Sequence, residues 1–173
     1  MNAAVITISD RSYRGEQDDL SGPTLWHLLT EAGFHVVAGY ILPDEAELIA
    51  TLLSRLADDG GVDLIITTGG TGPAPRDVTP EATRAVIQRE MPGLAELLRW
   101  DGYQRTPCAV LARGVAGIRG QTLIVNLPGN PRAVREGMEV LTPLLAPTIH
   151  LIHGQKLEKG MCAPSVSATQ PSR

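Results

Sequence analysis

The stretch VDLIITTGGTGPAPRDVTP, residues 62–80, decides the fold of this chain. Its first part, Val62–Thr68, is a continuous apolar and β-branched run, which is typical of a strand buried on both faces of a parallel sheet. A loop rich in Gly and Pro follows, and it ends at Thr79 and Pro80, a cap and proline pair that predicts the start of a helix. Strand, glycine-rich loop and helix in this order indicate one unit of an open α/β sheet.

Similar strands and helices are predicted on both sides of this stretch. The apolar runs that predict strands are 3–9, 35–42 (nearer a sheet edge) and 121–127, and 107–111 could pair with 121–127 as a hairpin, making the sheet mixed. Amphipathic patterns predict helices over 23–32, 45–57, 80–89, 93–100, 132–141 and 144–153, with Pro143 and Pro147 breaking or kinking the last pair. Alternating strands and helices favour an open sheet covered by helices on both faces.

Length and composition favour one compact domain with an aliphatic core. The 173 residues are 43% hydrophobic but only 3% aromatic, and they include 18 glycines and 13 prolines. We expect a single domain over residues 1–154, followed by a loose or disordered tail over 155–173, which lacks periodicity. So few aromatic side chains argue against a protein that binds nucleic acid by stacking on its bases.

Charge and cysteine content exclude further classes. The net charge is −4, and the only lysines are Lys156 and Lys159, so the chain shows no electrostatic footprint for nucleic acid or an anionic membrane. Cys108, expected to be buried in an apolar run, and Cys162 form neither a disulfide framework nor a metal-ligand spacing. No segment is long and apolar enough to cross a membrane, and we expect a cytoplasmic protein.

Polar loops follow the predicted strands at one edge of the sheet. They contain Ser9–Arg11 with the loop that continues to Asp18–Pro23, then Pro43–Glu45, Thr67–Pro80 and Asn126–Pro131. Ligands of open α/β sheets bind outside the carboxyl ends of the strands, so these loops are the candidate site.

The glycines of the third loop allow two interpretations of about equal weight. Gly69, Gly70 and Gly72, with Thr71, could turn their N–H groups inward as a nest for phosphate oxygens. The alternative is an ordinary turn between a strand and a helix. Neither the Walker A motif nor the dinucleotide-binding glycine pattern is present. Asp77 favours the first interpretation if a cation lies between its carboxylate and a bound anion.

Asp44 also has two interpretations. Asp44 and Glu47 precede an apolar helix with the spacing of a capping box. Asp44 also follows the carboxyl end of a strand, beside the proposed nest. Together with Asp77 it could hold a Mg²⁺ ion whose other ligands are phosphate oxygens and water.

Other polar residues are weaker candidates. His150 and His153 lie one helical turn apart without further metal ligands, and they are better explained as surface side chains. Ser9, Ser12 and Ser21 have no recognisable base, so a nucleophilic triad is not supported. Arg11, Arg14 and Arg76 can be solvated charges, although their loops place them near an anion site.

Several motifs occur together and in order in one known family. The chain resembles the molybdopterin adenylyltransferases of molybdenum-cofactor biosynthesis, which include the bacterial MogA/MoaB group and the G domains of the plant and gephyrin relatives. The resemblance covers roughly residues 3–154. The motifs are TISDR (7–11), DLSGP (19–23), PDE (43–45), TGGTG (68–72), RDVTPEAT (76–83), GIRG (117–120) and NLPGNP (126–131).

The resemblance implies a fold, an activity and a site. The fold would be a three-layer α/β/α domain whose mostly parallel central sheet has one antiparallel strand, usually assembled as a trimer or a dimer of trimers. The activity would be Mg²⁺- and ATP-dependent adenylylation of molybdopterin, with possible contact to the partner that inserts molybdenum. The implied site residues are Asp44 and Asp77 for catalysis and metal, Thr7, Ser9, Gly69, Gly70, Thr71 and Gly72 for the nucleotide and its phosphates, and Ser21, Gly22, Pro128 and Gly129 for molybdopterin.

One position departs from the family pattern. Where relatives commonly have Leu-Ser-Arg, this chain has Leu111, Ala112 and Arg113, so a hydroxyl is missing from the active-site region. A binding protein that holds the pterin without adenylylating it is therefore an alternative, and an assembly or scaffold role is a third. The sequence does not distinguish a trimer from a hexamer, or a molybdenum from a tungsten pathway.

Overall fold

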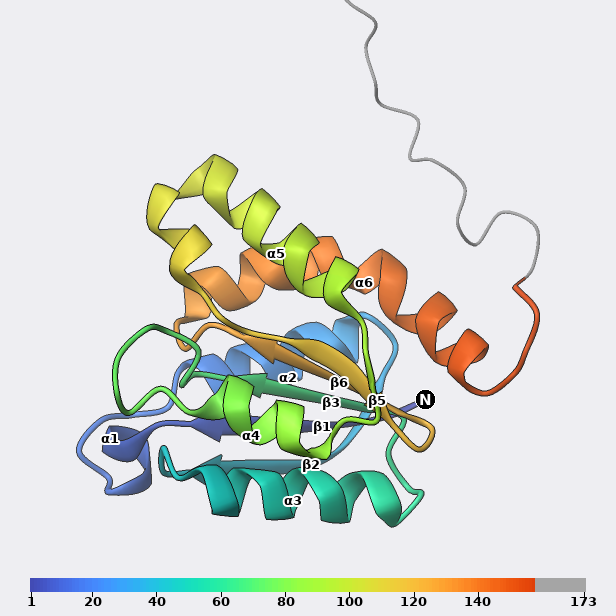
Figure 1. Cartoon of the computed structure of the whole chain (residues 1–173), viewed down its shortest axis with the longest axis horizontal. Coiled ribbons are helices and arrows are strands. Elements are labelled where there is room, and N and C mark those ends of the chain that lie inside the picture. Colours follow the sequence, from blue (N-terminus) through green and yellow to red (C-terminus); the bar gives the residue numbers. More distant parts are fainter. Residues whose placement is uncertain (158–173) are drawn as a thin grey trace, which may run out of the picture.

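The computed structural model describes residues 1–157 as a sheet of six strands with helices on both faces (Figure 1). The strands lie in the order β2-β1-β3-β6-β5-β4. Only β5 runs antiparallel to its neighbours, which confirms the expected fold class. The strands are β1 (Asn2–Ile8), β2 (His35–Leu42), β3 (Leu64–Thr68), β4 (Arg89–Glu90), β5 (Ala116–Arg119) and β6 (Thr122–Leu127).

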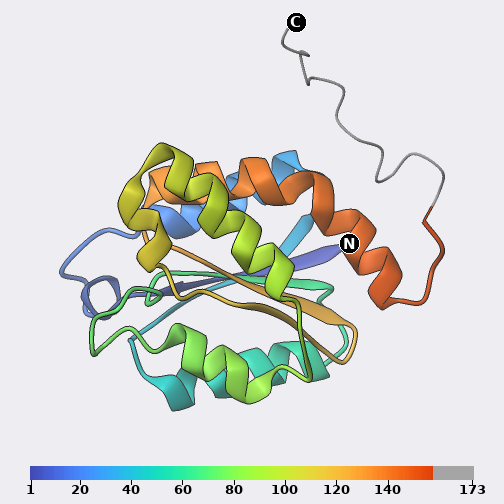
Figure 2. The ribbon, with the colours of Figure 1, turned by 45° about the horizontal axis from the view of Figure 1, so that its top comes forward.

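Helices form two layers around this sheet, as Figure 2 shows. Side chains of α2, α5 and α6 pack on one face, against Val5, Ile66 and Val125. Side chains of α3 and α4 pack on the other face, against Ile6, Ile65 and Ile124. The helices are α1 (Asp10–Tyr13), α2 (Ser21–Glu31), α3 (Ala46–Asp58), α4 (Thr79–Val86), α5 (Pro92–Arg105) and α6 (Pro131–Ile152), with a 3-10 helix η1 (Pro107–Leu111).

The continuous apolar runs are explained by this double cover. Neighbouring residues of β3 and β6 point to opposite faces, and both faces are buried, so every position needs an apolar or internally bonded side chain. β2 is an edge strand, as predicted, and several of its positions are exposed. Among residues 1–157, no helix is long and apolar enough to span a membrane.

The prediction of a strand over Pro107–Leu111 is wrong. This segment forms η1, and the hairpin partner of β6 is β5, connected through Gly120 at a φ of 57°. Pro107 lacks the N–H group that a ladder needs, but it is tolerated in the first turn of a helix. Cys108 is exposed on η1 rather than buried, because the segment lies outside the sheet.

The C-terminal helix is continuous where a break was one of the expectations. α6 runs from Pro131 through Pro143 and Pro147. Met138, Leu141, Leu145 and Ile149 are buried at helical spacing in the core, and this packing offsets the hydrogen bonds that the prolines remove. The tail predicted for 155–173 lies, beyond residue 157, outside the described residues.

Candidate functional site

The four predicted loops meet at one edge of the sheet. β1 and β3 are parallel and in register at Thr7 and Thr68, and β3 and β6 are in register at Thr68 and Leu127. Ile8 of β1 pairs with Leu42 of β2. Because all four strands end together, the loops that follow them face the same space.

The glycine-rich loop presents unpaired backbone amides. Gly69 and Gly70 adopt φ angles of 103° and 61°, which residues with a side chain rarely adopt. The loop carbonyls are bound away from the cleft: Thr79 donates through its hydroxyl to Gly69 and through its N–H to Gly70. The N–H groups of Gly70, Thr71 and Gly72 have no acceptor within residues 1–157. This geometry suits an anion such as phosphate.

A buried network of polar side chains connects the two strands and the helix that flank this loop. Asn126 of β6 donates to the hydroxyls of Thr67 and Thr83, each at 3.0 Å, and accepts a hydrogen bond from the N–H of Val115. Thr83 in turn donates to the carbonyl of Thr79. β3, β6 and the first turn of α4 are therefore fixed to one another beneath the amides.

Asp44 and Asp77 both lie beside the loop. A Cβ atom added to Gly70 would lie 2.8 Å from Oδ1 of Asp44, and one added to Gly72 would lie 2.7 Å from Oδ2 of Asp77. Asp77 accepts a hydrogen bond from the N–H of Ala74. The loop glycines thus leave room for the carboxylates on either side of the amides.

The capping interpretation of Asp44 is wrong. The residue before α3 is Glu45, and no side chain caps that helix. Asp44 instead exchanges hydrogen bonds with Asp10: the N–H of Asp10 donates to Oδ2 of Asp44 at 3.0 Å, and the N–H of Asp44 donates to Oδ1 of Asp10 at 3.1 Å. Asp10 also binds the guanidinium of Arg76, for which the sequence left open a solvated charge or contact with a bound anion.

The pKa values of Asp10 and Asp44 shift in opposite directions. Hydrogen bonding to Arg76 lowers the pKa of Asp10. Burial raises the pKa of Asp44, and the neighbouring charges of Asp10 and Asp77 raise it further. The nearby charge of Arg76 offsets this rise only in part, so a bound cation would stabilise the Asp44 carboxylate.

The residues present fit a metal site in which the protein supplies only part of the ligands and a bound substrate and water supply the others. No group of three or more His, Cys, Asp or Glu side chains that could hold a metal occurs within residues 1–157. Two carboxylates beside an anion-binding loop are what Mg²⁺ uses when phosphate oxygens and water supply its other ligands.

A second group of predicted residues lies at the end of β1 and the start of α2, namely Thr7, Ser9, Ser21 and Gly22. Asp19, named above only as the first residue of the DLSGP motif, accepts hydrogen bonds from the hydroxyls of Thr7 (2.7 Å) and Ser21 (3.2 Å) and from the N–H of Gly22 (2.9 Å). The hydroxyl of Ser9 accepts from Ser12 and caps α1. Thr7 and Ser21 thus join β1 to α2.

Two adjoining cavities divide the predicted residues. A cleft of about 580 Å³ is lined by Gly70, Thr71, Gly72, Asp77, Pro128 and Gly129. A smaller cavity of about 140 Å³ is lined by Thr7, Ser9, Ser21 and, again, Gly129. Asp44, Gly69 and Gly22 line neither of these cavities, and Gly22 lies on a groove between α2 and β2.

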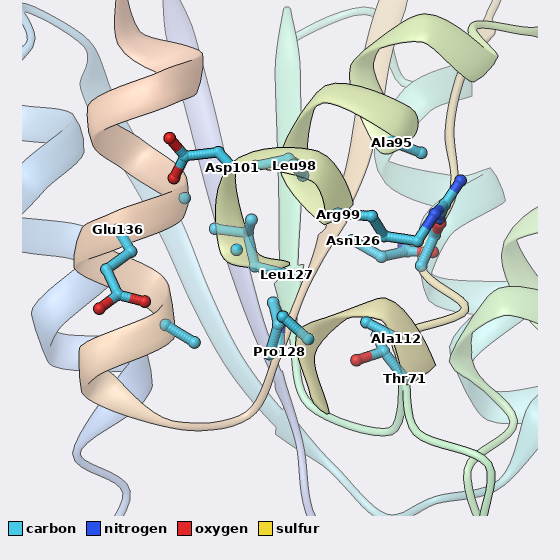
Figure 3. A pocket seen from close by; sticks show the side chains of 15 residues that line it. Thr71, Ala95, Leu98, Arg99, Asp101, Ala112, Asn126, Leu127, Pro128 and Glu136 are labelled. Carbon is cyan, nitrogen blue, oxygen red and sulfur yellow. The ribbon is translucent and has the colours of Figure 1, made fainter. Parts of the chain in front are cut away.

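Ala112 lines both the large cleft and a small pocket of about 70 Å³, and Figure 3 shows it among the residues of the small pocket. Thr71 and Pro128 also line both spaces, and Asn126 and Arg99 belong to the small pocket. The position of the missing hydroxyl therefore faces the same cleft as the loop amides. His150 and His153, by contrast, lie at the far end of α6 and bind Gln155 and the carbonyl of Gln121.

The fold and the site together define an α/β/α protein with a glycine-rich loop, suited to an anion, and two carboxylates at the carboxyl edge of its sheet. A family model described as a probable molybdopterin binding domain matches residues 4–147. The chain belongs to this family, and the resemblance of its motifs is confirmed.

Similar proteins agree with this assignment. The molybdopterin adenylyltransferase of Helicobacter pylori is 41% identical over 160 residues, which are 91% of either chain. That of Escherichia coli is 43% identical over 142 residues, which cover 80% of this chain and 72% of the relative. The molybdopterin biosynthesis enzyme MoaB of Thermus thermophilus is 46% identical in its crystal structure, with a TM-score of 0.84 over 91% of this chain and 99% of that one.

Proposed function

We propose that this chain adenylylates molybdopterin with ATP, giving adenylyl-molybdopterin and pyrophosphate in molybdenum-cofactor biosynthesis. The observation that carries the proposal is the row of amides at Gly70, Thr71 and Gly72, which have no acceptor in the described part of the chain and lie between the carboxylates of Asp44 and Asp77. The relatives named molybdopterin adenylyltransferase, similar over most of both chains, support the choice of substrates.

The reaction joins two anions, so charge neutralisation dominates its barrier. A terminal phosphate oxygen of molybdopterin attacks the α-phosphorus of ATP, the bond to the bridging oxygen breaks, and pyrophosphate leaves with that electron pair. The loop amides donate to phosphate oxygens on which charge develops, and they are already oriented before the reaction. No side-chain nucleophile is needed.

Asp44 and Asp77 are the residues that would hold Mg²⁺. When bound, the ion neutralises phosphate charge and acts as a Lewis acid. Asp44 would bind the ion as a carboxylate, so protons compete with the metal, and the raised pKa of Asp44 extends this competition to higher pH than for an ordinary aspartate.

Pyrophosphate release from purified protein, Mg-ATP and molybdopterin tests the proposal. Asp77→Asn should reduce the rate by at least about a hundredfold, since a metal carboxylate is lost. Asp58→Asn is a matched control, because Asp58 is an exposed partner of Arg119 away from the site. Absence of turnover by the unmodified chain would contradict the proposal.

A second candidate is a binding protein that holds molybdopterin without adenylylating it. Ala112 favours it, because this residue faces the cleft where relatives commonly carry a hydroxyl. Tight binding of the pterin without pyrophosphate release would select this candidate.

We also propose that the chain assembles as a homotrimer. Large apolar side chains are exposed on α5 and η1, among them Trp100 and Tyr103, whose rings stack at 6.5 Å, and Val110. Such a patch supports a contact between subunits. Light scattering on the purified protein would reveal the mass of the assembly.

A further inference from the structure

Arg113 is bound to the glycine-rich loop by both its backbone and its side chain. Its N–H donates to the carbonyl of Thr71 at 2.8 Å, its Nε donates to the carbonyl of Gly72 at 2.8 Å, and its Nη2 donates to the carbonyl of Asp77 at 2.6 Å. Nη1 binds Glu81 in the first turn of α4. Every nitrogen of this guanidinium therefore donates to the protein rather than to the cleft.

These contacts determine where the loop amides point. In a trans peptide, the C=O and N–H groups point in opposite directions. Because the carbonyl of Thr71 is drawn to Arg113, the N–H of Gly72 faces away from it. The carbonyl of Gly70 is held by the N–H of Thr79, which turns the N–H of Thr71 in the same way. Both residues line the large cleft.

The same guanidinium also holds the backbone of Asp77. Its carboxylate lies against the loop and accepts from Ala74, while its carbonyl accepts from Arg113. Arg113 thus connects the amides to the carboxylate across the proline-containing segment 73–75. A planar fork of donors can bind separated carbonyls at once, whereas a lysine ammonium acts as a single point.

We propose that Arg113 is a positioning residue that sets the spacing between the amides of Thr71 and Gly72 and the carboxylate of Asp77, and thereby the affinity for a Mg²⁺-bound phosphate chain. This inference rests on the proposed function, in which amides and carboxylate act on one nucleotide. Glu81 holds the guanidinium in place from the other side, and Arg113 lowers the pKa of that carboxyl.

The test compares Arg113→Lys with Arg119→Lys. Arg119 is a matched control: its Nε and Nη2 bind Asp58, its Nη1 binds the carbonyl of Val86, and it is likewise partly buried. Both variants should lower Tm by similar amounts. Only Arg113→Lys should weaken binding of Mg²⁺ and a non-hydrolysable ATP analogue, by about tenfold, and lower kcat for pyrophosphate release by about ten- to a hundredfold, as expected for sub-ångström misplacement.

Glu81→Ala supplies a second, milder variant. It leaves all Arg113 donors to the loop intact but frees one side of the guanidinium, so a loss smaller than that of Arg113→Lys is expected. If Arg113→Lys does not fold, a loss of analogue affinity in Glu81→Ala at unchanged secondary structure supports the inference, and unchanged affinity overturns it.

The outcomes separate this inference from the proposed function. If the unmodified chain turns over and Arg113→Lys retains full analogue affinity and kcat, or loses no more than Arg119→Lys, the positioning role is wrong and the function stands. If the unmodified chain binds the analogue without releasing pyrophosphate, but Arg113→Lys binds it tenfold more weakly, the positioning role stands and the proposed function fails. Absence of nucleotide binding by the unmodified chain overturns both.

Discussion

Gly72→Ala is a substitution that should damage the site and spare the fold. The φ angle of Gly72 is not positive, so its backbone conformation accepts alanine. The new Cβ would lie 2.7 Å from Oδ2 of Asp77, where ordinary contact begins at 3.4 Å. The carboxylate must therefore retreat by about 0.7 Å, or the loop must move by the same amount.

The displacement of the Asp77 carboxylate determines how much kcat should fall. A misplacement of about 1 Å can cost about a hundredfold in rate, so a shift of this size predicts a loss of roughly ten- to a hundredfold in kcat. That range corresponds to about 1.4–2.7 kcal/mol of transition-state stabilisation. Pyrophosphate release measured across a Mg²⁺ titration would show it, together with a weaker apparent Mg²⁺ affinity.

Gly93→Ala is the matched control. Nothing lies within 4 Å of a Cβ at Gly93, which is in the first turn of α5. Alanine should stabilise this helix by up to about 1 kcal/mol and leave the rate unchanged. If Gly72→Ala reacts within about twofold of the unmodified chain, then Asp77 does not need its present position, and the reasoning on this site fails.

Two other predictions concern Asp44, which lies beside the glycine-rich loop, and Ala112, which lines the cleft. Asp44→Asn should abolish Mg²⁺-dependent turnover yet raise the Tm of metal-free protein at pH 7. Because its folded pKa is raised, Asp44 stabilises the fold below the ordinary pKa of an aspartate, and this contribution is lost as the pH rises through the folded value. The gain in Tm should therefore vanish near pH 3, and an equal gain at both pH values would contradict the assigned cause. Ala112→Ser should raise kcat by about tenfold if the hydroxyl reaches a charged phosphate, a contribution of about 1.4 kcal/mol. An unchanged rate would show that another donor, such as the hydroxyl of Thr71, already fills that role.

The sheet could be predicted from the sequence because most of its strands are buried on both faces. β1, β3 and β6 are continuous apolar runs of five to seven residues, a length typical of strands and short for an α-helix. β4 was missed because its two residues, Arg89 and Glu90, are both exposed. The strand β5 was missed because it has only four residues, and the neighbouring run Pro107–Leu111 has a stronger apolar pattern.

The strand topology allowed the location of the site to be predicted, but not the side-chain contacts within it. Parallel strands that end together place the loops of Asp44 and Asp77 at one edge, whatever the details of packing. The role of Arg113 could not be predicted because its partners Gly72 and Asp77 are 41 and 36 residues away, and a guanidinium in a loop has no periodic signal. Asp10 was likewise quoted only as a loop residue, while its partner Arg76 is 66 residues distant.

Gly69 and Gly129 are packed backbone against backbone. A Cβ on Gly129 would lie 2.8 Å from the Cα of Gly69, and one on Gly69 would lie 2.1 Å from the carbonyl oxygen of Ile8. The loops after β1, β3 and β6 therefore pack directly through their backbones at these positions. No side chain lies between them whose size a substitution could reduce or increase. A redesign of this protein for a differently substituted pterin or another nucleotide therefore has to keep both Gly69 and Gly129. Changes of specificity have to come from side chains on the cleft walls, such as Thr71, Cys108 and Arg132.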